Sequence, residues 1–437
     1  MGKCTRSLLS ILLLLQYVLF CNTQNAPLRK WSAKFTPKEI EVDMDTESQV
    51  LLELFDIDLV HTAIIKVQSD NPNIAQVLTD IPIKSKSNSS ADHWAANITV
   101  KAVFLGQTRL FVELTTTDNV IETSTSELMV TIVRALRPID IAFTVSVALL
   151  VSLLYINFGA ALDLSVLSGL LRRPVGPTIG FFTQFLVMPL LSFGLGCLLF
   201  PDSVEMQLGL FFTGVSPSGG ASNIWTVLLG GNINLSVLMT TISNIAAFGM
   251  MPLWIFTLGH VIFNRGKLGV PYGKIATFAV SLIVPLAIGV AIQKCSPRIT
   301  RVLVRLLKPI STMLILFIIV FAIVTNLYLF KLFSWKIIIA GLGLPWLGYG
   351  LSWFVAKLLK QTQPDALTIA IETGIQNTGI AIFLLRFSLP QPQADLTTVI
   401  PVSVAIMTPF PLLALYLFKK FSDKRSTANS GESQSII

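Results

Sequence analysis

Two polar segments interrupt long apolar runs and decide the fold: Gly214-Val215-Ser216-Pro217-Ser218-Gly219-Gly220-Ala221-Ser222-Asn223 and Glu372-Thr373-Gly374-Ile375-Gln376-Asn377-Thr378-Gly379. A helix that is broken at membrane depth frees backbone groups, which are tolerated only where protein or a water-filled cavity covers them. Two such breaks in separate halves of a chain indicate a transporter-type binding site near the bilayer midplane. The residues expected to break the helices are Pro217, Gly219, Gly220, Gly374 and Asn377.

Apolar runs of the length of a membrane span surround the two breaks. Only 13% of the 437 residues are charged, against about 25% in an ordinary soluble chain. The uncharged runs are residues 141–162, 174–201, 206–264, 275–293, 309–330, 337–356 and 396–418, and residues 366–385 add one that contains Glu372. A crossing helix needs about 20 residues, so residues 206–264 hold two helices with a turn at Gly230-Gly231-Asn232. The sequence therefore predicts nine transmembrane helices.

The distribution of Lys and Arg predicts the orientation of these helices, because loops on the cytosolic side carry the excess of positive charge. With the N-terminus outside, the inner loops carry 13 Lys and Arg residues. The outer loops carry 6, Arg386 among them, or 8 when Arg134 and Arg137 are included. We therefore expect a multi-pass protein of the plasma membrane with an exoplasmic N-terminus and a cytosolic C-terminus. The basic residues lie between apolar runs rather than in one patch, so nucleic acid is not an expected partner.

The chain before the first span has a different pattern. Residues 1–24 place Lys3 and Arg6 before an apolar run at residues 8–20, which predicts a signal peptide, with an uncleaved anchor as the alternative. Residues 25–137 show a period of two at residues 39–45, where acidic and apolar residues alternate. Further strand-like runs are residues 50–55, 64–67, 98–103, 110–114 and 128–133. A small exoplasmic β-sandwich is therefore expected before a transporter domain at residues 138–420.

Three smaller expectations concern the parts of the chain outside the membrane. Asn88 and Asn97 begin glycosylation sequons in the segment expected to be exoplasmic. Asp56, Asp58 and Asp70 lie near turns, where calcium binding is the alternative to simple solvation. Residues 421–437 are polar and are expected to form a disordered cytosolic tail.

The second break contains Glu372, the only acidic residue placed well inside any span. An ionised carboxylate there is costly without a cation, and no Lys or Arg is placed deep in a span to supply one. The hydroxyl and amide oxygens of Ser222, Asn223, Ser236, Thr240 and Gln376 are hard ligands that suit a small alkali cation. The alternative is structural: hydroxyls that bond their own helix, glycines that allow close packing, and a protonated Glu372.

The two segments resemble the sodium/bile acid cotransporter family. The matching stretches are Pro217-Ser218-Gly219-Gly220-Ala221-Ser222-Asn223, Gly231-Asn232-Ile233-Asn234-Leu235-Ser236-Val237-Leu238-Met239-Thr240-Thr241, Met251-Pro252, Glu372-Thr373-Gly374-Ile375-Gln376-Asn377, and Thr183-Gln184-Phe185-Leu186-Val187-Met188-Pro189. The resemblance covers residues 138–420. Bile acid carriers usually have Gly where this chain has Ser218, and we expect that difference to leave ion binding unaffected.

The resemblance implies an all-α membrane domain of panel and core parts, built from inverted repeats, in which two broken helices cross beside two sodium sites. By motif position, one site would contain Ser222, Asn223, Ser236, Thr240 and Glu372. The other would contain Gln184, Glu372 and Gln376, with the carbonyls of Thr373 and Ile375. Gln184 follows from the resemblance alone.

The resemblance also implies sodium-coupled import of a small amphipathic organic anion, of the bile acid or sulfated steroid class. The sequence has no HExxH, P-loop or GxSxG motif, so an enzyme is not expected, and no cofactor is expected beyond Na⁺ as the coupling ion. The alternatives are a non-transporting scaffold or receptor whose exoplasmic domain binds a partner, and a proton-coupled carrier. The sequence leaves the oligomeric state open.

Overall fold

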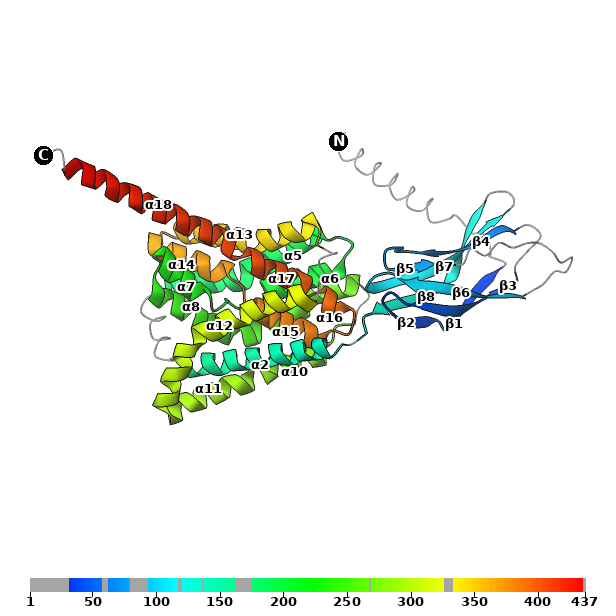
Figure 1. Cartoon of the computed structure of the whole chain (residues 1–437), viewed down its shortest axis with the longest axis horizontal. Helices are drawn as coiled ribbons and strands as arrows, with labels where there is room; N and C mark the ends of the chain where they lie inside the picture. Colours follow the sequence, from blue (N-terminus) through cyan, green and yellow to red (C-terminus); the bar gives the residue numbers. More distant parts are fainter. Residues whose placement is uncertain are drawn as a thin grey trace, which may run out of the picture. The chain divides into compact units, whose positions relative to one another are not determined.

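The computed structural model describes residues 31–56, 62–78, 93–116, 120–135, 137–161, 174–266, 269–325 and 333–434. The chain divides into two compact units, Met1–Ala135 and Leu136–Ile437. The first unit is β-rich and the second is helical (Figure 1). The expected signal peptide and Asn88 lie outside the described residues.

The β-rich unit contains two four-stranded sheets, and its strands follow from the period-two pattern of the sequence. One sheet has the order β1 (Ser32–Thr36), β3 (Glu47–Phe55), β6 (His93–Ala102), β5 (Ala75–Val77). The other has the order β2 (Glu39–Asp43), β8 (Ile121–Val133), β7 (Gly106–Thr116), β4 (Thr62–Ser69). Neighbours are antiparallel except β2 and β8, which are parallel. The sequence analysis did not identify β1 and β5, which are short.

The two sheets share one apolar core. Every second residue of β3 is buried, as at Leu52 and Leu54, and Leu110 of β7 and Val130 of β8 are buried in the same cluster. Because side chains alternate across a strand, the residues between them face outward. Asn97 is one of these outward residues and is exposed on β6, as its expected glycosylation requires. Asp70, a residue of the calcium alternative, lies 3.6 Å from Arg109.

The helical unit follows the predicted spans, with interruptions at polar segments and at prolines. Its elements are α2 (Pro138–Ala161), α4 (Val175–Phe182), η2 (Thr183–Val187), α5 (Met188–Leu199), α6 (Val204–Gly214), α7 (Ser222–Leu229), α8 (Ile233–Trp254), η3 (Ile255–Gly259), α9 (His260–Arg265), α10 (Tyr272–Ser281), α11 (Ile283–Cys295), α12 (Pro297–Thr325), α13 (Trp335–Leu358), α14 (Gln363–Gly374), α15 (Thr378–Ser388), α16 (Gln393–Leu396), α17 (Val399–Met407) and α18 (Pro409–Gln434).

Within the described residues, five continuous helical stretches are long and apolar enough to cross a membrane. They are Pro138–Ala161, Val175–Leu199, Ile233–Arg265, Trp335–Leu358 and Gln393–Ser422. Many large apolar side chains of this unit are exposed, for example Leu149 at 60% and Phe354 at 59%. A soluble surface rarely carries so much continuous apolar area, so these side chains fit contact with lipid.

The C-terminal segment differs from its expectation. The disordered tail predicted at residues 421–437 is wrong for residues 421–434, because α18 continues as a helix to Gln434. The segment 419–434 contains one glycine and no proline, so nothing in its backbone chemistry ends the helix at the apolar boundary.

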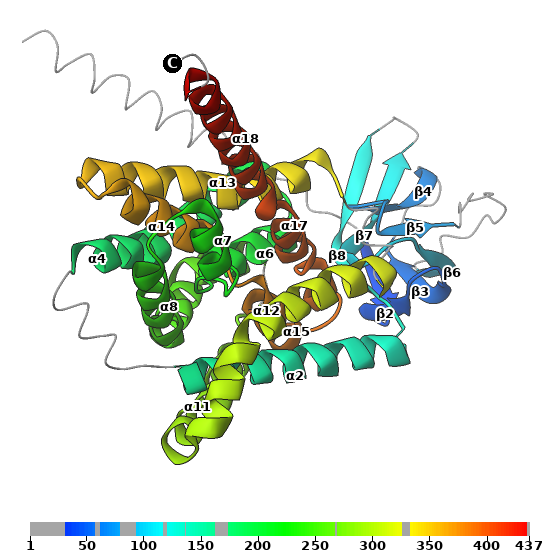
Figure 2. The ribbon, with the colours of Figure 1, turned by 60° about the vertical axis from the view of Figure 1, so that its left-hand side comes forward.

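The helices α2, α11 and α12 pack on one another along one side of the unit (Figure 2). The approach of α2 to α11 is set by two glycines. A Cβ atom at Gly159 would lie 2.1 Å from the carbonyl oxygen of Leu286, and one at Gly289 would lie 2.1 Å from the carbonyl oxygen of Ile156. Small residues allow such backbone contact between membrane helices.

We predict that Gly289→Ala lowers the thermal stability of the purified protein, because α2 and α11 must separate to accept the methyl group. Overpacking of this kind costs about 1–3 kcal/mol. The matched control is Gly350→Ala in α13, where an added Cβ would meet nothing within 4 Å. Melting temperatures in detergent check the prediction, and an equal effect of the two substitutions would contradict it.

Candidate functional site

The two broken helices cross at their breaks. The backbone amide of Gly219, between α6 and α7, donates to the carbonyl of Ile375 at 2.8 Å. The amide of Asn377, at the start of α15, donates to the carbonyl of Pro217 at 2.8 Å. Ser218 and Gln376 thereby form a short antiparallel bridge. Each break satisfies backbone groups of the other, which the absence of water in a bilayer requires.

The expected break residues all lie at this crossing. Pro217, Gly219 and Gly220 lie between α6 and α7, Gly374 is the last residue of α14, and Asn377 caps α15 by accepting from the Ile380 amide at 3.3 Å. Gly219 is required by close approach, because a Cβ there would lie 2.9 Å from the carbonyl oxygen of Gln376.

Glu372 lies in the last turn of α14 beside the crossing, and it is 1% exposed. Ser236 Oγ donates to Glu372 Oε1 at 2.5 Å, and Thr240 Oγ1 donates to Oε2 at 2.8 Å. Ser236 and Thr240 are four residues apart on α8 and therefore share one helix face. The carboxylate is thus held by hydroxyl groups from a helix distant in sequence.

The α7 residues complete this cluster. Asn223 Oδ1 accepts from Ser236 Oγ at 2.7 Å, and Asn223 Nδ2 donates to Thr240 Oγ1 at 3.4 Å. Ser222 Oγ is buried near the Glu372 carboxyl group and makes no hydrogen bond of normal geometry with the described residues. An unsatisfied buried hydroxyl costs free energy, and a bound cation would use its oxygen. The structure therefore brings four residues of the first predicted sodium site together in hydrogen bonds, with Ser222 buried near them.

In the part of the chain that the structure describes, no cationic side chain pairs with the Glu372 carboxyl group. Among the described residues, the ion pairs do not include Glu372. The same part of the chain has no group of three or more His, Cys, Asp and Glu side chains placed to hold a metal ion. The oxygens gathered here belong to one carboxylate, several hydroxyls and one amide. Such a set suits a hard monovalent cation better than a transition metal.

Residues of the second predicted site also contact one another. Gln184 Nε2 donates to the Ser216 carbonyl at 2.7 Å and to Gln376 Oε1 at 2.9 Å. Gln376 Nε2 donates to the Thr373 carbonyl at 2.6 Å. The Ile375 carbonyl, another expected ligand, accepts from Gly219 at the crossing. Gln184 and Gln376 are therefore together, while Glu372 is hydrogen-bonded within the first cluster.

A small cavity connects the two groups. Its lining includes Gln184, Ser218, Ser243 and Glu372, together with Phe181 of α4. Gln184 lies in the π-helical segment η2, five residues before Pro189. Wider helical turns of this kind are frequent at functional sites. Pro189 inside the apolar run was thus the sequence signal that could have found Gln184 without the family resemblance.

Ser218 lies at this site, which the sequence analysis did not predict. Its Oγ donates to Glu372 Oε2 at 2.8 Å, while its expected lack of effect on ion binding stays a prediction. Its amide donates to Ser243 Oγ at 2.9 Å. Thr183 was also missed, and its Oγ1 lies 2.8 Å from Thr373 Oγ1. None of these three contacts could be predicted from residue spacing, since each joins segments more than 20 residues apart.

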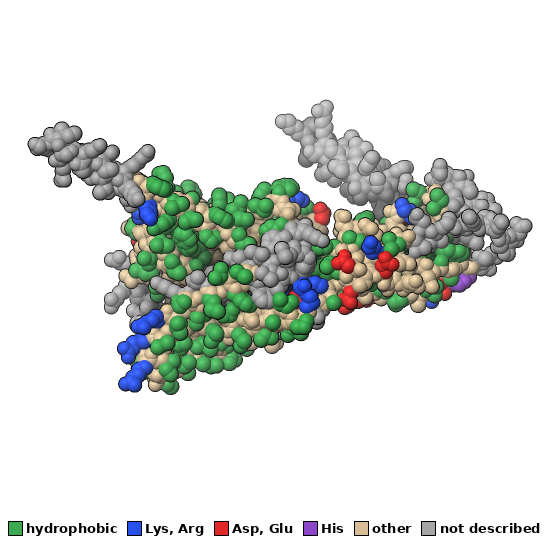
Figure 3. Space-filling view, viewed as in Figure 1, with side chains coloured by type: hydrophobic (Ala, Val, Ile, Leu, Met, Phe, Trp, Pro, Cys, Tyr) green, Lys and Arg blue, Asp and Glu red, His purple; other side chains and the backbone are tan. Residues whose placement is uncertain are grey.

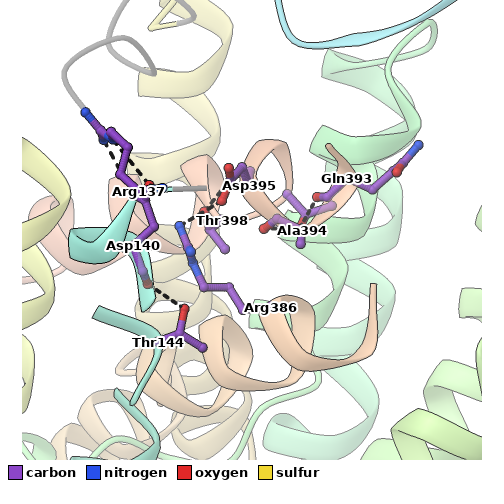
Figure 4. A network of polar contacts seen from close by, with 9 residues as sticks. Arg137, Asp140, Thr144, Arg386, Gln393, Ala394, Asp395 and Thr398 are labelled. Carbon is purple, nitrogen blue, oxygen red and sulfur yellow. Dashed lines mark hydrogen bonds and ion pairs between the residues drawn. The ribbon is translucent and has the colours of Figure 1, made fainter. Parts of the chain in front are cut away.

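A second buried charge lies near the far end of α15 (Figure 4). Arg386, which the sequence assigned to an outer loop, has a side chain only 7% exposed and lies 3.0 Å from Asp395 Oδ1 of α16. Its guanidinium also lies over the ring of Phe143 of α2, 4.7 Å from the centroid. The Arg386 guanidinium therefore pairs with Asp395 and contacts the ring of Phe143, and it does not pair with Glu372.

Comparisons with known proteins show which family the chain resembles. The model of the Sodium Bile acid symporter family matches residues 148–333. The human P3 protein (Homo sapiens) is 33% identical over 272 residues, which are 62% of this chain and 57% of that protein. The ileal sodium/bile acid cotransporter of Cricetulus griseus is 30% identical over 297 residues, 66% of this chain and 84% of that protein.

A further relative matches both units. Sodium/bile acid cotransporter 5 of Rattus norvegicus is 25% identical over 433 residues, 96% of this chain and 95% of that protein. The chain thus spans little more than half the length of the P3 proteins but almost all of this relative. The family model includes the first break and ends before the second. Because the ileal sodium/bile acid cotransporter is 30% identical over 84% of its own length, the chain belongs to the sodium/bile acid cotransporter family.

Proposed function

We propose that this protein is a sodium-coupled symporter that imports a small amphipathic organic anion, of the bile acid or sulfated steroid class, by alternating access. The observation that carries the proposal is the buried Glu372 carboxylate, which is surrounded by hydroxyl groups and has no cationic partner among the described residues. A charge in such a place needs a counter-ion that comes from solution. The names of the relatives agree with sodium as that ion.

In this proposal, the first sodium binds among Ser222, Asn223, Ser236, Thr240 and Glu372, and Ser218 supports the carboxylate. The second binds near Gln184 and Gln376, with the carbonyls of Thr373 and Ile375. Occupation neutralises Glu372 and orders the two breaks, which favours the binding of substrate in an adjoining cavity. The protein then acts as a carrier rather than as an enzyme.

A second cavity, separate from the one beside Glu372, is lined by apolar side chains and supports the proposed substrate class. It lies between α2, α8, η3, α10 and α15, and its lining residues are Tyr155, Ala247, Phe248, Met251, Pro252, Ile255, Ile275, Leu282 and Leu384. In this conformation the cavity is too small to hold a steroid nucleus, so the proposal requires α2 and α10 to move away from α8 and α15 when the substrate binds. The cavity lies where α2 and α10 pack against α8 and α15. We propose that α2 and α10–α12 form the panel and that the other helices form the core, with nine spans in all.

The proposal places the protein in the plasma membrane, with the β-rich unit exoplasmic and α18 ending in the cytosol. Two alternatives differ in measurable ways. A proton-coupled carrier would respond to pH but not to the exchange of sodium for potassium at fixed pH. A scaffold or receptor would show neither response, and its working part would be the β-rich unit.

The first prediction concerns ion binding. Sodium should raise the melting temperature of the purified protein above its value in equal potassium, and Glu372→Gln should remove the difference. A ligand at one hundred times its Kd stabilises the folded state by about 2.7 kcal/mol. The matched control is Glu205→Gln at the start of α6, which should keep the sodium response. A response that survives in Glu372→Gln would contradict the assignment of the ion site.

The second prediction concerns Ser218. Ser218→Ala should lower the melting temperature in potassium more than in sodium, because the carboxylate loses a hydrogen bond that a bound cation would replace. Hydrogen bonds to charged groups contribute about 1.5–3 kcal/mol. Ser192→Ala is the control, since the buried Ser192 hydroxyl donates to the Pro189 carbonyl at 2.9 Å, outside the ion site. Equal losses in sodium and potassium for Ser218→Ala would show that its hydroxyl is only structural.

The third prediction concerns the substrate. Leu384→Trp should fill the apolar cavity and reduce sodium-dependent uptake of a radiolabelled steroid sulfate at least tenfold, while the sodium-dependent rise in melting temperature remains. Phe354→Trp on the exposed face of α13 is the control for the added bulk. Unchanged uptake in a correctly folded Leu384→Trp variant would move the substrate site elsewhere.

A further inference from the structure

The turn between α11 and α12 carries a group of exposed basic side chains. Lys294 lies in the last turn of α11, and Arg298, Arg301 and Arg305 follow on α12. All four residues are exposed. The three arginines are three and four residues apart, so they share one face of α12. We call these four residues the basic stripe. Figure 3 shows Lys and Arg side chains gathered at the end of the helical unit where α11 meets α12.

No acidic side chain neutralises the basic stripe within the described residues. The ion pairs there do not include any of its four members. The chain has no Asp or Glu between Glu205 and Asp365, so the helices α10 to α13 contain none. Within the basic stripe, Arg301 Nε donates to the carbonyl oxygen of Pro297 at 3.3 Å.

Other basic residues at the same end of the unit have internal partners. Lys419 Nζ donates to the Leu229 carbonyl at 3.1 Å. Lys420 lies over the ring of Tyr416, 6.0 Å from its centroid. Lys419 is therefore bonded to the end of α7, and Lys420 lies against an aromatic ring of its own helix, α18. The arginines of the basic stripe are exposed, and the side-chain hydrogen bond of Arg301 joins it to the Pro297 carbonyl of the same helix.

The length of α12 places the basic stripe at the edge of the bilayer. The helix has 29 residues, which is about 43 Å at 1.5 Å per residue, whereas the hydrocarbon layer is about 30 Å thick. The excess lies at the start of the helix, where the arginines are. Ile299 and Val302 are exposed beside them, at 51% and 54%. Apolar and basic side chains on neighbouring faces are typical of a helix segment at the level of the lipid headgroups.

We propose that the basic stripe binds the phosphate groups of anionic phospholipids in the leaflet that faces the cytosol, and thereby anchors the group of α2 and α10–α12. Charge complementarity selects this occupant, because guanidinium groups bind phosphate through paired hydrogen bonds. The assignment of the leaflet rests on the proposed orientation, whereas the binding itself depends neither on sodium nor on substrate. An anchored helix group would be the fixed part against which the other helices move.

The test measures the melting temperature of the full chain in neutral detergent and potassium buffer, with phosphatidylserine or phosphatidylcholine added at equal concentration. Phosphatidylserine should raise the melting temperature by about 2–4 °C, and 0.5 M salt should reduce this rise, which charge screening requires. Phosphatidylcholine should have little effect. The variant R298Q/R301Q/R305Q should lose the rise.

Two variants control for charge and fold. R298K/R301K/R305K should retain most of the rise, because the positive charge is kept. K357Q/K360Q removes two exposed lysines at the inner end of α13 and should retain the full rise. Since the three arginines are exposed, R298Q/R301Q/R305Q should melt near the wild type in phosphatidylcholine, which shows that it is folded.

Three results would overturn the proposal. They are no rise for the wild type, the same rise for R298Q/R301Q/R305Q, or an equal rise with phosphatidylcholine. An equal rise with glycerophosphoserine, the headgroup without acyl chains, would identify a soluble phosphate ligand instead of the bilayer. None of these results depends on the sodium response, so this proposal and the proposed transport function fail separately.

Discussion

The helical unit depends on one constraint: polar groups that lie where water is absent must be satisfied by the protein itself. The backbone amides of Gly219 and Asn377 bond the carbonyls of the opposite break, so the two broken helices complete each other. The carboxylate of Glu372 stands beside this crossing and receives hydroxyl groups from α8 and from Ser218. Both the interrupted helical hydrogen bonds and the buried carboxyl group of Glu372 are thus accommodated at one place.

This arrangement gives the proposed coupling a physical basis. Both breaks and the hydroxyl face of α8 meet at Glu372, whereas the apolar cavity also has walls from α2 and α10. An ion that orders the crossing therefore acts on one wall of the cavity and not directly on the other. Because a ligand shifts an equilibrium only by its differential affinity for two states, sodium would favour the conformation in which the crossing is best ordered.

The prolines next to the π-helical segments illustrate how local chemistry shapes the site. Pro189 lacks a backbone amide, and the wider turn η2 before it directs Gln184 to the Ser216 carbonyl and to Gln376. Pro252 similarly precedes η3, which contributes Ile255 to the apolar cavity. Departures from regular helix geometry therefore occur at the surfaces of both cavities.

The sequence by itself indicated which part of the chain lies in lipid and which part lies in water. The length of an apolar run and the alternation of polar and apolar residues are local properties that can be read along the chain. It also located the two breaks and Glu372, since Gly, Pro and a carboxylate inside an apolar run have few structural explanations. The family resemblance supplied Gln184 and the grouping of the ligands. Only the tertiary structure decided that Ser218 bonds Glu372, that Thr183 meets Thr373, and that Arg386 is buried against Asp395 and Phe143. Each of these contacts joins separate helices, and their relative placement is a result of packing that spacing along one helix does not contain.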